Sequence, residues 1–193
     1  MLICVTGKSG SGKSTLSKLL AKQLGYKYIN VDELSHQIYE NAEVVNKLIN
    51  LFGTQVCNNW GKLDRKKIGQ IIFNKNNLST VEKFNNITWP YIKNLIDAEL
   101  CNNCIIDWNL LPLTEFWQHK SIKILVKAKD QNKRLEKIIE RDKIAKHYAM
   151  LRDNAGINYN EHEFDFVFEN NYNLDALNIF VKSVVNFITK LVM

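Results

Sequence analysis

The stretch that decides the fold of this 193-residue chain is Gly7-Lys8-Ser9-Gly10-Ser11-Gly12-Lys13-Ser14. It matches the pattern GxxxxGK[ST] at every fixed position, between an apolar stretch, Leu2–Thr6, and an amphipathic one, Lys13–Leu24. Strand, glycine-rich turn and helix in this order predict a loop whose peptide N–H groups surround phosphate beside the positive end of a helix. A glycine-rich turn without a ligand would not need Lys and Ser in fixed order after the last glycine. We therefore expect a nucleoside triphosphate to bind here.

The residues of this loop have distinct expected roles. Lys13 can reach the β- and γ-phosphates, the Ser14 hydroxyl can ligate the Mg²⁺ that bridges them, and Thr15 is expected at the α-phosphate. The nucleotide-binding residues predicted here are Lys8, Ser9, Gly10, Ser11, Gly12, Lys13, Ser14 and Thr15. A guanine-specific switch protein would need an NKxD-type base reader, and the nearest strings in the chain lack the aspartate. We therefore do not expect a GTPase, and Mg²⁺ is the metal ion expected with the triphosphate.

Short apolar runs alternate with amphipathic stretches along the rest of the chain, a pattern typical of parallel strands joined by helices. The expected strands are Leu2–Thr6, 27–31, Cys104–Asp107, 122–127 and 165–169. They predict an α/β domain over residues 1–193, a P-loop NTPase fold with a five-stranded parallel sheet and helices on both faces. Residues 41–101 are helical and too long for a simple crossover, so we expect a substrate-binding insertion there.

Several helix boundaries also follow from the sequence. Asp64 and Asp130 are expected to cap the helices Arg65–Phe73 and 131–140, and Pro90 is expected to separate two helices. The last helix, from about residue 173, carries one apolar stripe: Leu174, Leu177, Val181, Val184, Ile188 and Leu191. Such a stripe serves either a coiled coil or docking on the sheet, and we favour docking.

Two aspartates stand at the carboxyl ends of expected strands, where open α/β sheets place ligand-contacting residues. Asp32 can accept or orient a hydroxyl during phosphoryl transfer, or cap the helix expected over 33–40. Asp107 can help to hold Mg²⁺, or cap a turn. Position alone leaves both alternatives open for each residue.

Three arginines follow the fourth expected strand. Arg134 and Arg141 lie seven residues apart on one helix face, and Arg152 comes after them. Guanidinium groups clamp triphosphates in the closed state of many phosphotransferases, which excludes water from the transfer. The alternative is a solvated charged face, and the sequence leaves both readings open.

The composition limits which classes of partner we expect for this protein. The net charge is +6, but lysines are spread along the chain without a dense basic arm, so we expect no nucleic-acid partner. No stretch reaches the roughly 18 to 20 apolar residues of a membrane span, and no secretion signal precedes the first strand, so we expect a cytoplasmic protein without membrane contact. Cys101 and Cys104 form only half of a zinc site, which favours reduced thiols. Between a monomer and an oligomer we favour the monomer.

Beyond the loop, the chain resembles the dephospho-CoA kinase family over nearly its whole length. The segments that carry the resemblance are 29–37, Phe52-Gly53, 61–65, Ile72-Phe73, Trp89-Pro90, 107–115, Arg134-Leu135, Arg141-Asp142, Arg152 and 165–170. Three departures stand out. His36 replaces the usual arginine, Trp89 replaces a histidine, and the shorter lid lacks the glutamine expected after Arg152. Because imidazole is not always charged, His36 puts acceptor affinity in question more than reaction type.

The resemblance implies that ATP phosphorylates the ribose 3'-hydroxyl of dephospho-CoA, giving CoA and ADP. It implies that Asp32 is the base, that Lys13 and Arg141 stabilise the migrating phosphoryl group, that 41–101 binds CoA and that 141–163 forms a lid. By the same resemblance the nucleotide contacts extend to Arg134, Arg152 and Asn170, and the acceptor contacts are Asp32, His36, Arg65 and Asp107. The competing expectations are another small-molecule kinase, with a nucleoside, nucleoside monophosphate or sugar acid as acceptor, and an ATP-binding protein that has lost catalysis.

Overall fold

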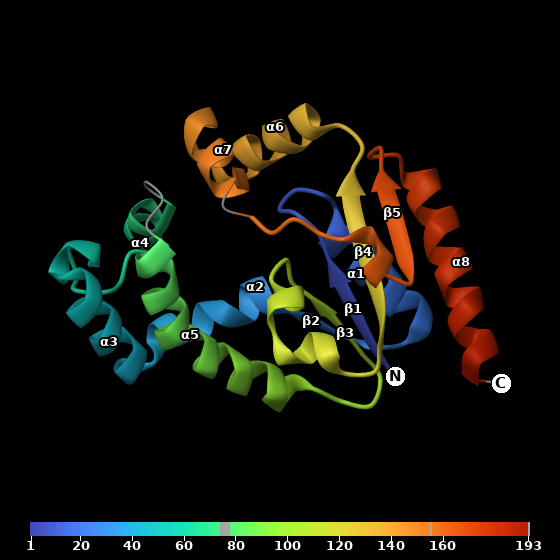
Figure 1. Cartoon of the computed structure of the whole chain (residues 1–193), viewed down its shortest axis with the longest axis horizontal. Coiled ribbons are helices and arrows are strands. Elements are labelled where there is room, and N and C mark those ends of the chain that lie inside the picture. Colours follow the sequence, from blue (N-terminus) through green and yellow to red (C-terminus); the bar gives the residue numbers. More distant parts are fainter. Residues whose placement is uncertain (74–77, 155, 193) are drawn as a thin grey trace. The chain divides into compact units, whose positions relative to one another are not determined.

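The computed structural model describes residues 1–73, 78–154 and 156–192, without the side chains of Phe73, Leu78, Arg152 and Val192. Its strands are β1 (Leu2–Thr6), β2 (Lys27–Asn30), β3 (Cys104–Asp107), β4 (Ser121–Ala128) and β5 (Phe166–Asn170). They form one parallel sheet in the order β2-β3-β1-β4-β5 (Figure 1). The predicted fold class is confirmed. All five expected strands are present, because their apolar residues are buried in the sheet.

The helices differ in length and regularity. The α-helices are α1 (Lys13–Leu24), α2 (Val31–Leu34), α3 (Ala42–Phe52), α4 (Arg65–Phe73), α5 (Leu78–Glu99), α6 (Gln131–Asp142), α7 (Lys146–Asn154) and α8 (Leu174–Val192). Short 3-10 helices are η1 (Ser35–Glu40), η2 (Thr54–Val56), η3 (Leu111–Leu113), η4 (Glu115–Gln118) and η5 (Glu161–Glu163). In the described part of the chain, no helix is both long and apolar enough to cross a membrane.

The chain divides into two compact units. The first, Met1–Asn30 with Leu100–Met193, contains the sheet, α1 and α6 to α8. The second, Val31–Glu99, is helical and contains α2 to α5. The insertion expected over 41–101 lies mostly within this second unit, which begins directly after β2.

One face of the sheet carries the main hydrophobic core. Leu16 and Leu20 of α1 pack there with the α8 residues Leu177, Val181, Val184 and Ile188. Figure 1 shows α8 running alongside β5. The predicted docking of the last helix is therefore confirmed for the middle of its stripe, whereas Leu174 and Leu191 at the two ends are exposed.

Pro90 does not break the helix as expected. Helix α5 continues through it from Leu78 to Glu99. Pro90 removes the hydrogen bond to the carbonyl of Asn86, but both residues are exposed, so water can satisfy that carbonyl. Buried Thr88 and Ile92 flank the proline, and their packing holds both halves of the helix in line.

The predicted helix caps at Asp64 and Asp130 are confirmed, whereas the alternative that Asp32 caps a helix is wrong. Oδ1 of Asp64 accepts from the amides of Lys66 and Lys67, and Oδ1 of Asp130 accepts from those of Asn132 and Lys133. Asp32, by contrast, is the second residue of α2 and not its cap, because the helical turn begins directly after β2 at Val31. This removes the capping explanation for Asp32.

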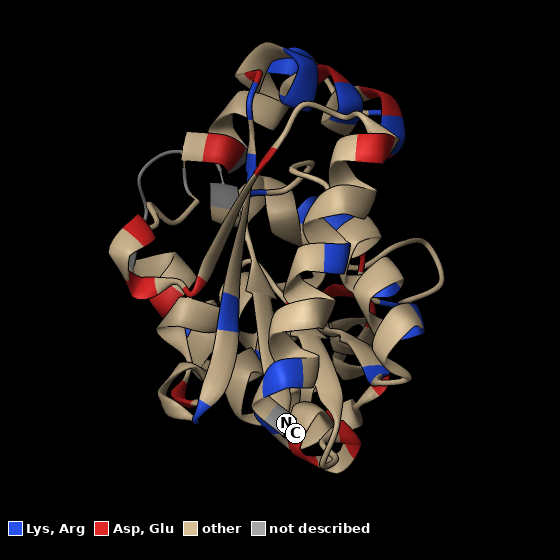
Figure 2. Ribbon diagram, turned by 90° about the vertical axis from the view of Figure 1, so that its right-hand side faces the viewer, with Lys and Arg blue, Asp and Glu red and all other residues tan. Residues whose placement is uncertain are grey.

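The positive charge is interspersed with acids. Figure 2 shows Lys and Arg beside Asp and Glu on the helices at the top of the view, α6 and α7. In α6 alone, Glu136, Glu140 and Asp142 alternate with lysines and arginines. These helices therefore present a mixed surface, in keeping with the lysine distribution along the sequence.

Candidate active site

The loop between β1 and α1 needs its glycines. Gly10 and Gly12 have φ angles of 76° and 95°, in the left-handed region that favours glycine. A Cβ on Gly7 would overlap the carbonyl oxygen of Val126, and one on Gly12 would overlap the side-chain amide of Asn170. The motif therefore lets the backbone curl while neighbouring elements approach it closely.

Three consecutive carbonyl groups of the loop are held from outside. The carbonyl of Ser9 accepts from Arg134 at 3.0 Å, that of Gly10 from the phenol of Tyr172 at 3.1 Å, and that of Ser11 from Nδ2 of Asn170 at 2.8 Å. A trans peptide directs the next N–H away from its carbonyl, so the amides of Gly10 and Gly12 point to the opposite side. This leaves them oriented for an anion in the loop.

Lys13 begins α1 and lies close to the end of β3. Its Nζ is 3.9 Å from Oδ1 of Asp107, and both side chains are buried. The ammonium thus has a carboxylate within ion-pair distance, so its burial alone does not require a bound phosphate. Ser14 is half-buried and Thr15 is exposed in the first turn of α1.

Asp107 has a further partner that the sequence did not indicate. The phenol of Tyr28, on β2, donates to its Oδ2 at 2.9 Å. Tyr28 stands two residues before the end of β2, and β2 pairs with β3. The parallel pairing of these strands places the two side chains together, whereas the sequence offers only a tyrosine in a short strand.

The two arginines of α6 both reach the loop, but in different ways. Arg134 is 1% exposed and lies against the loop backbone, where it also bonds Gln131 at 2.8 Å. Arg141 is largely exposed, and its guanidinium reaches Oγ of Ser9 at 3.3 Å while pairing with Asp142. The alternative of a solvated charged face is therefore wrong for Arg134. The side chain of Arg152 lies outside the described part of the structure.

Asp153, on α7, is a second residue that the sequence reasoning missed. Its Oδ2 lies 2.7 Å from NH2 of Arg134, and its Oδ1 lies 3.7 Å from Nζ of Lys8. One carboxylate thus pairs with both a buried guanidinium and a lysine of the loop, and the three groups together keep one positive charge. No spacing rule connects these three residues, so only the folded chain reveals the cluster.

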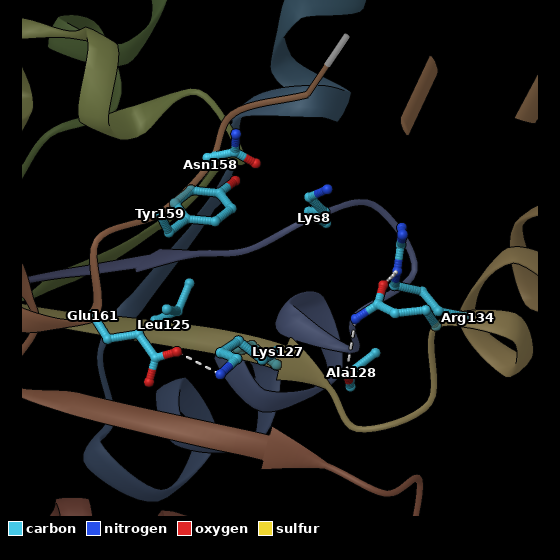
Figure 3. Close-up of a pocket in the computed structure, with 10 residues that line it drawn as sticks. Lys8, Leu125, Lys127, Ala128, Arg134, Asn158, Tyr159 and Glu161 are labelled. Carbon is cyan, nitrogen blue, oxygen red and sulfur yellow. Dashed lines mark hydrogen bonds and ion pairs between the residues drawn. The ribbon is translucent and has the colours of Figure 1, made fainter. Parts of the chain in front are cut away.

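A cavity of about 190 Å³ lies beside this cluster at the carboxyl end of β4. Figure 3 shows Lys8 and Tyr159 on one side of it and the ion pair of Lys127 with Glu161 on the other. The phenol of Tyr159 donates to the carbonyl of Asn109 at 2.8 Å, which ties the segment after α7 to the loop after β3. The cavity therefore borders the phosphate-binding loop within the first unit.

The remaining predicted residues belong to the second unit. Asp32 is in α2, His36 in η1, and Arg65 opens α4 with its guanidinium 5.8 Å from the ring centre of Tyr39. Burial lowers the pKa of His36, and the charge of Arg65 lowers it further, while Asp32 and Glu33 act in the opposite direction. The second unit therefore brings three of the four predicted acceptor contacts into one electrostatic neighbourhood, whereas Asp107 belongs to the first unit.

Comparison with known proteins supplies the family. A family model described as dephospho-CoA kinase matches residues 1–176. A dephospho-CoA kinase of Fusobacterium nucleatum is 35% identical over 182 residues, which cover 92% of this chain and 93% of the relative. Among solved structures, a dephospho-CoA kinase from Campylobacter jejuni has a TM-score of 0.64 at 25% identity, covering 100% of this chain and 98% of that one. A shikimate kinase from Acinetobacter baumannii has a TM-score of 0.55 at 15% identity, with coverages of 98% and 93%, and shares the fold.

Proposed function

The chain belongs to the dephospho-CoA kinase family, and from this membership we propose that it transfers the γ-phosphoryl group of ATP to the ribose 3'-hydroxyl of dephospho-CoA. In this reaction a bond forms between the 3'-oxygen and the γ-phosphorus, and the bond from that phosphorus to the β–γ bridging oxygen breaks. The products are CoA and ADP. The single observation that carries the proposal is the family match over residues 1–176, which includes the phosphate-binding loop and the whole helical unit.

The first unit provides the groups for the phosphates. The amides of Gly10 and Gly12 and the ammonium of Lys13 offer positive charge to the phosphate oxygens, and Arg141 adds a guanidinium at Ser9. Because these donors are held before the nucleotide arrives, they stabilise the charge that develops during transfer without reorganising. The residues Lys8 to Thr15, with Arg152, complete the proposed nucleotide contacts.

Mg²⁺ belongs to the proposal because the oxygen donors present suit it. The Ser14 hydroxyl and the buried carboxylate of Asp107, close to Lys13, are the hard ligands that this ion prefers. When bound, Mg²⁺ neutralises charge on the triphosphate. Arg134 and Asn170 act differently in our proposal. Each holds a carbonyl of the loop, so each supports nucleotide binding by shaping the loop.

The second unit provides the acceptor side. Asp32, two residues after β2, takes the proton of the 3'-hydroxyl as the new bond forms. His36 and Arg65 hold anionic groups of dephospho-CoA, and residues 41–101 form the surface on which it binds. Residues 141–163 act as the lid. We further propose that the protein works in the cytoplasm, as a monomer.

An acceptor assay tests the function directly. With Mg-ATP held constant, ADP formation is expected with dephospho-CoA and not with AMP, uridine, shikimate or gluconate. Turnover with one of the other acceptors in place of dephospho-CoA would replace the proposed substrate. Nucleotide binding without turnover of any acceptor would indicate an ATP-binding protein that has lost catalysis.

A further inference from the structure

Tyr172, in the turn between β5 and α8, adopts a conformation that its residue type disfavours. Its φ is 63°, in the left-handed region, where a side chain crowds the backbone and where glycine is the usual residue. A bulky residue stays in this region only when its surroundings fix it there. The interactions that fix Tyr172 therefore point to what the residue does.

Those interactions lead to the phosphate-binding loop. The backbone N–H of Tyr172 donates to Oδ1 of Asn170 at 2.7 Å, and Nδ2 of that same amide donates to the carbonyl of Ser11. The phenol of Tyr172 donates to the neighbouring carbonyl, that of Gly10, at 3.1 Å. One turn thus holds two successive peptide groups of the loop.

The ring of Tyr172 is fixed by α6. The ammonium groups of Lys133 and Lys137 lie 5.4 Å and 4.9 Å from the ring centre, at cation–π distance. The phenol is partly buried, and burial raises its pKa, so it keeps the proton that it donates. A glycine at this position could adopt the same backbone angles without strain, but it could neither bind Gly10 nor contact the lysines.

From these contacts we infer that Tyr172 is a positioning residue for the nucleotide. Its phenol holds the peptide between Gly10 and Ser11, which links the two peptides that carry the Gly10 and Gly12 amides, so that these two amides stay directed at the phosphates. The inference rests on the proposed use of ATP. It assigns to Tyr172 no contact with the acceptor alcohol. Loss of the hydroxyl is therefore expected to weaken ATP binding and to leave acceptor binding unchanged.

Tyr172→Phe tests this inference because it keeps the ring, the lysine contacts and the backbone angles. We expect the Kd for Mg-ATP, measured by calorimetry, to rise about fivefold, the effect of one lost hydrogen bond. The urea midpoint should fall by no more than the loss of one hydrogen bond explains. The control is Tyr26→Phe, because the ring of Tyr26 packs against the core beyond the other end of α1. It should bind Mg-ATP as the wild type does.

Tyr172→Gly distinguishes the effect of the phenol from that of the backbone conformation, because glycine removes the side chain and can keep the same backbone angles. If the residue positions the loop, this variant should bind Mg-ATP at least as weakly as Tyr172→Phe, although glycine removes the strain. Wild-type affinity in Tyr172→Gly, or a change below about twofold in Tyr172→Phe, would overturn the inference. In steady-state assays the KM for ATP should rise while the KM for dephospho-CoA and kcat stay constant, and a parallel rise of both KM values would also contradict it. Calorimetry with Mg-ATP contains no acceptor, so failure of the proposed acceptor chemistry would show in the acceptor assay instead.

Discussion

Tyr28 and Asp107 are joined across adjacent parallel strands by a hydrogen bond of 2.9 Å from the phenol to Oδ2. The carboxylate is buried, and its other oxygen faces Lys13 at 3.9 Å. A buried carboxylate that keeps both partners is held in one orientation. Tyr28 therefore fixes the acid that we assign to Mg²⁺ and to the phosphate-facing lysine.

Tyr28→Phe removes this bond without removing the ring. A hydrogen bond to a charged group contributes about 1.5 to 3 kcal/mol, so we expect kcat to fall about tenfold. The Mg²⁺ concentration for half-maximal rate should rise, because Asp107 loses its orientation. Steady-state kinetics over a Mg²⁺ titration measure both values. Unchanged Mg²⁺ dependence together with unchanged kcat would show that Tyr28 serves packing alone.

Asp32→Asn tests the proposed proton acceptor. Since the amide keeps the shape but not the basicity, kcat should fall about 10²-fold or more, while ATP affinity stays nearly constant. Glu33→Gln, at the next position of α2, is a matched control that removes one carboxylate of the same unit. Full activity of the Asp32 variant would exclude this residue as the base.

His36 predicts a pH dependence of acceptor binding. Burial, with help from Arg65, lowers the pKa of His36 below its ordinary value of 6.5. The imidazole is therefore neutral near physiological pH and gains its charge only as the pH falls below 6.5. If the protonated ring holds a phosphate of dephospho-CoA, the KM for this acceptor should decrease toward acidic pH and be flat above neutrality.

His36→Arg provides the comparison, because a guanidinium stays charged throughout. In this variant the KM for dephospho-CoA should be low and independent of pH over the same range. The KM for dephospho-CoA is measured at saturating Mg-ATP in the wild type and in His36→Arg. The phosphate titration of the acceptor itself is measured separately, so that its effect on KM can be told apart from that of His36. An acidic decrease of KM that persists in His36→Arg would assign the effect to another group.

Asp153→Asn should destabilise the first unit. Arg134 is buried, and removing the charge of its partner leaves a guanidinium without neutralisation. Breaking a buried pair costs about 3 to 5 kcal/mol, and because a fifth of the Asp153 side chain is exposed we expect about 3. Urea unfolding measures the loss.

The exposed pair of Lys127 with Glu161 is the control for this experiment. Half of the Glu161 side chain is exposed, so Glu161→Gln should cost below about 1 kcal/mol. Equal losses in the two variants would show that the burial of Arg134 does not govern the energetics of the cluster.

The sequence predicted best what local pattern controls. The strand Leu2–Thr6 and the helix Lys13–Leu24 have the predicted bounds, because continuous apolar residues and the glycine-rich motif mark their ends. The caps at Asp64 and Asp130 also depend only on the two or three residues that follow. The outcome at Pro90 depended on which side of α5 faces water, and the sequence around it does not show that.

Contacts between distant residues escaped prediction for a different reason. Tyr172 and Gly10 are 162 positions apart, and Arg134 and Ser9 are 125 apart. Arg134 was expected as a nucleotide clamp or a solvated residue, but no property of its sequence neighbourhood shows that it lies against the loop backbone. Such partners depend on the order of the strands, which residue spacing does not encode.

The overlap that a Cβ on Gly12 would make with Asn170 bears on how the protein is made. The amide that completes the fit of the glycine-rich segment is synthesised more than 150 residues after that segment. A nascent chain halted before β5 thus has the signature of a nucleotide site without the support that shapes it.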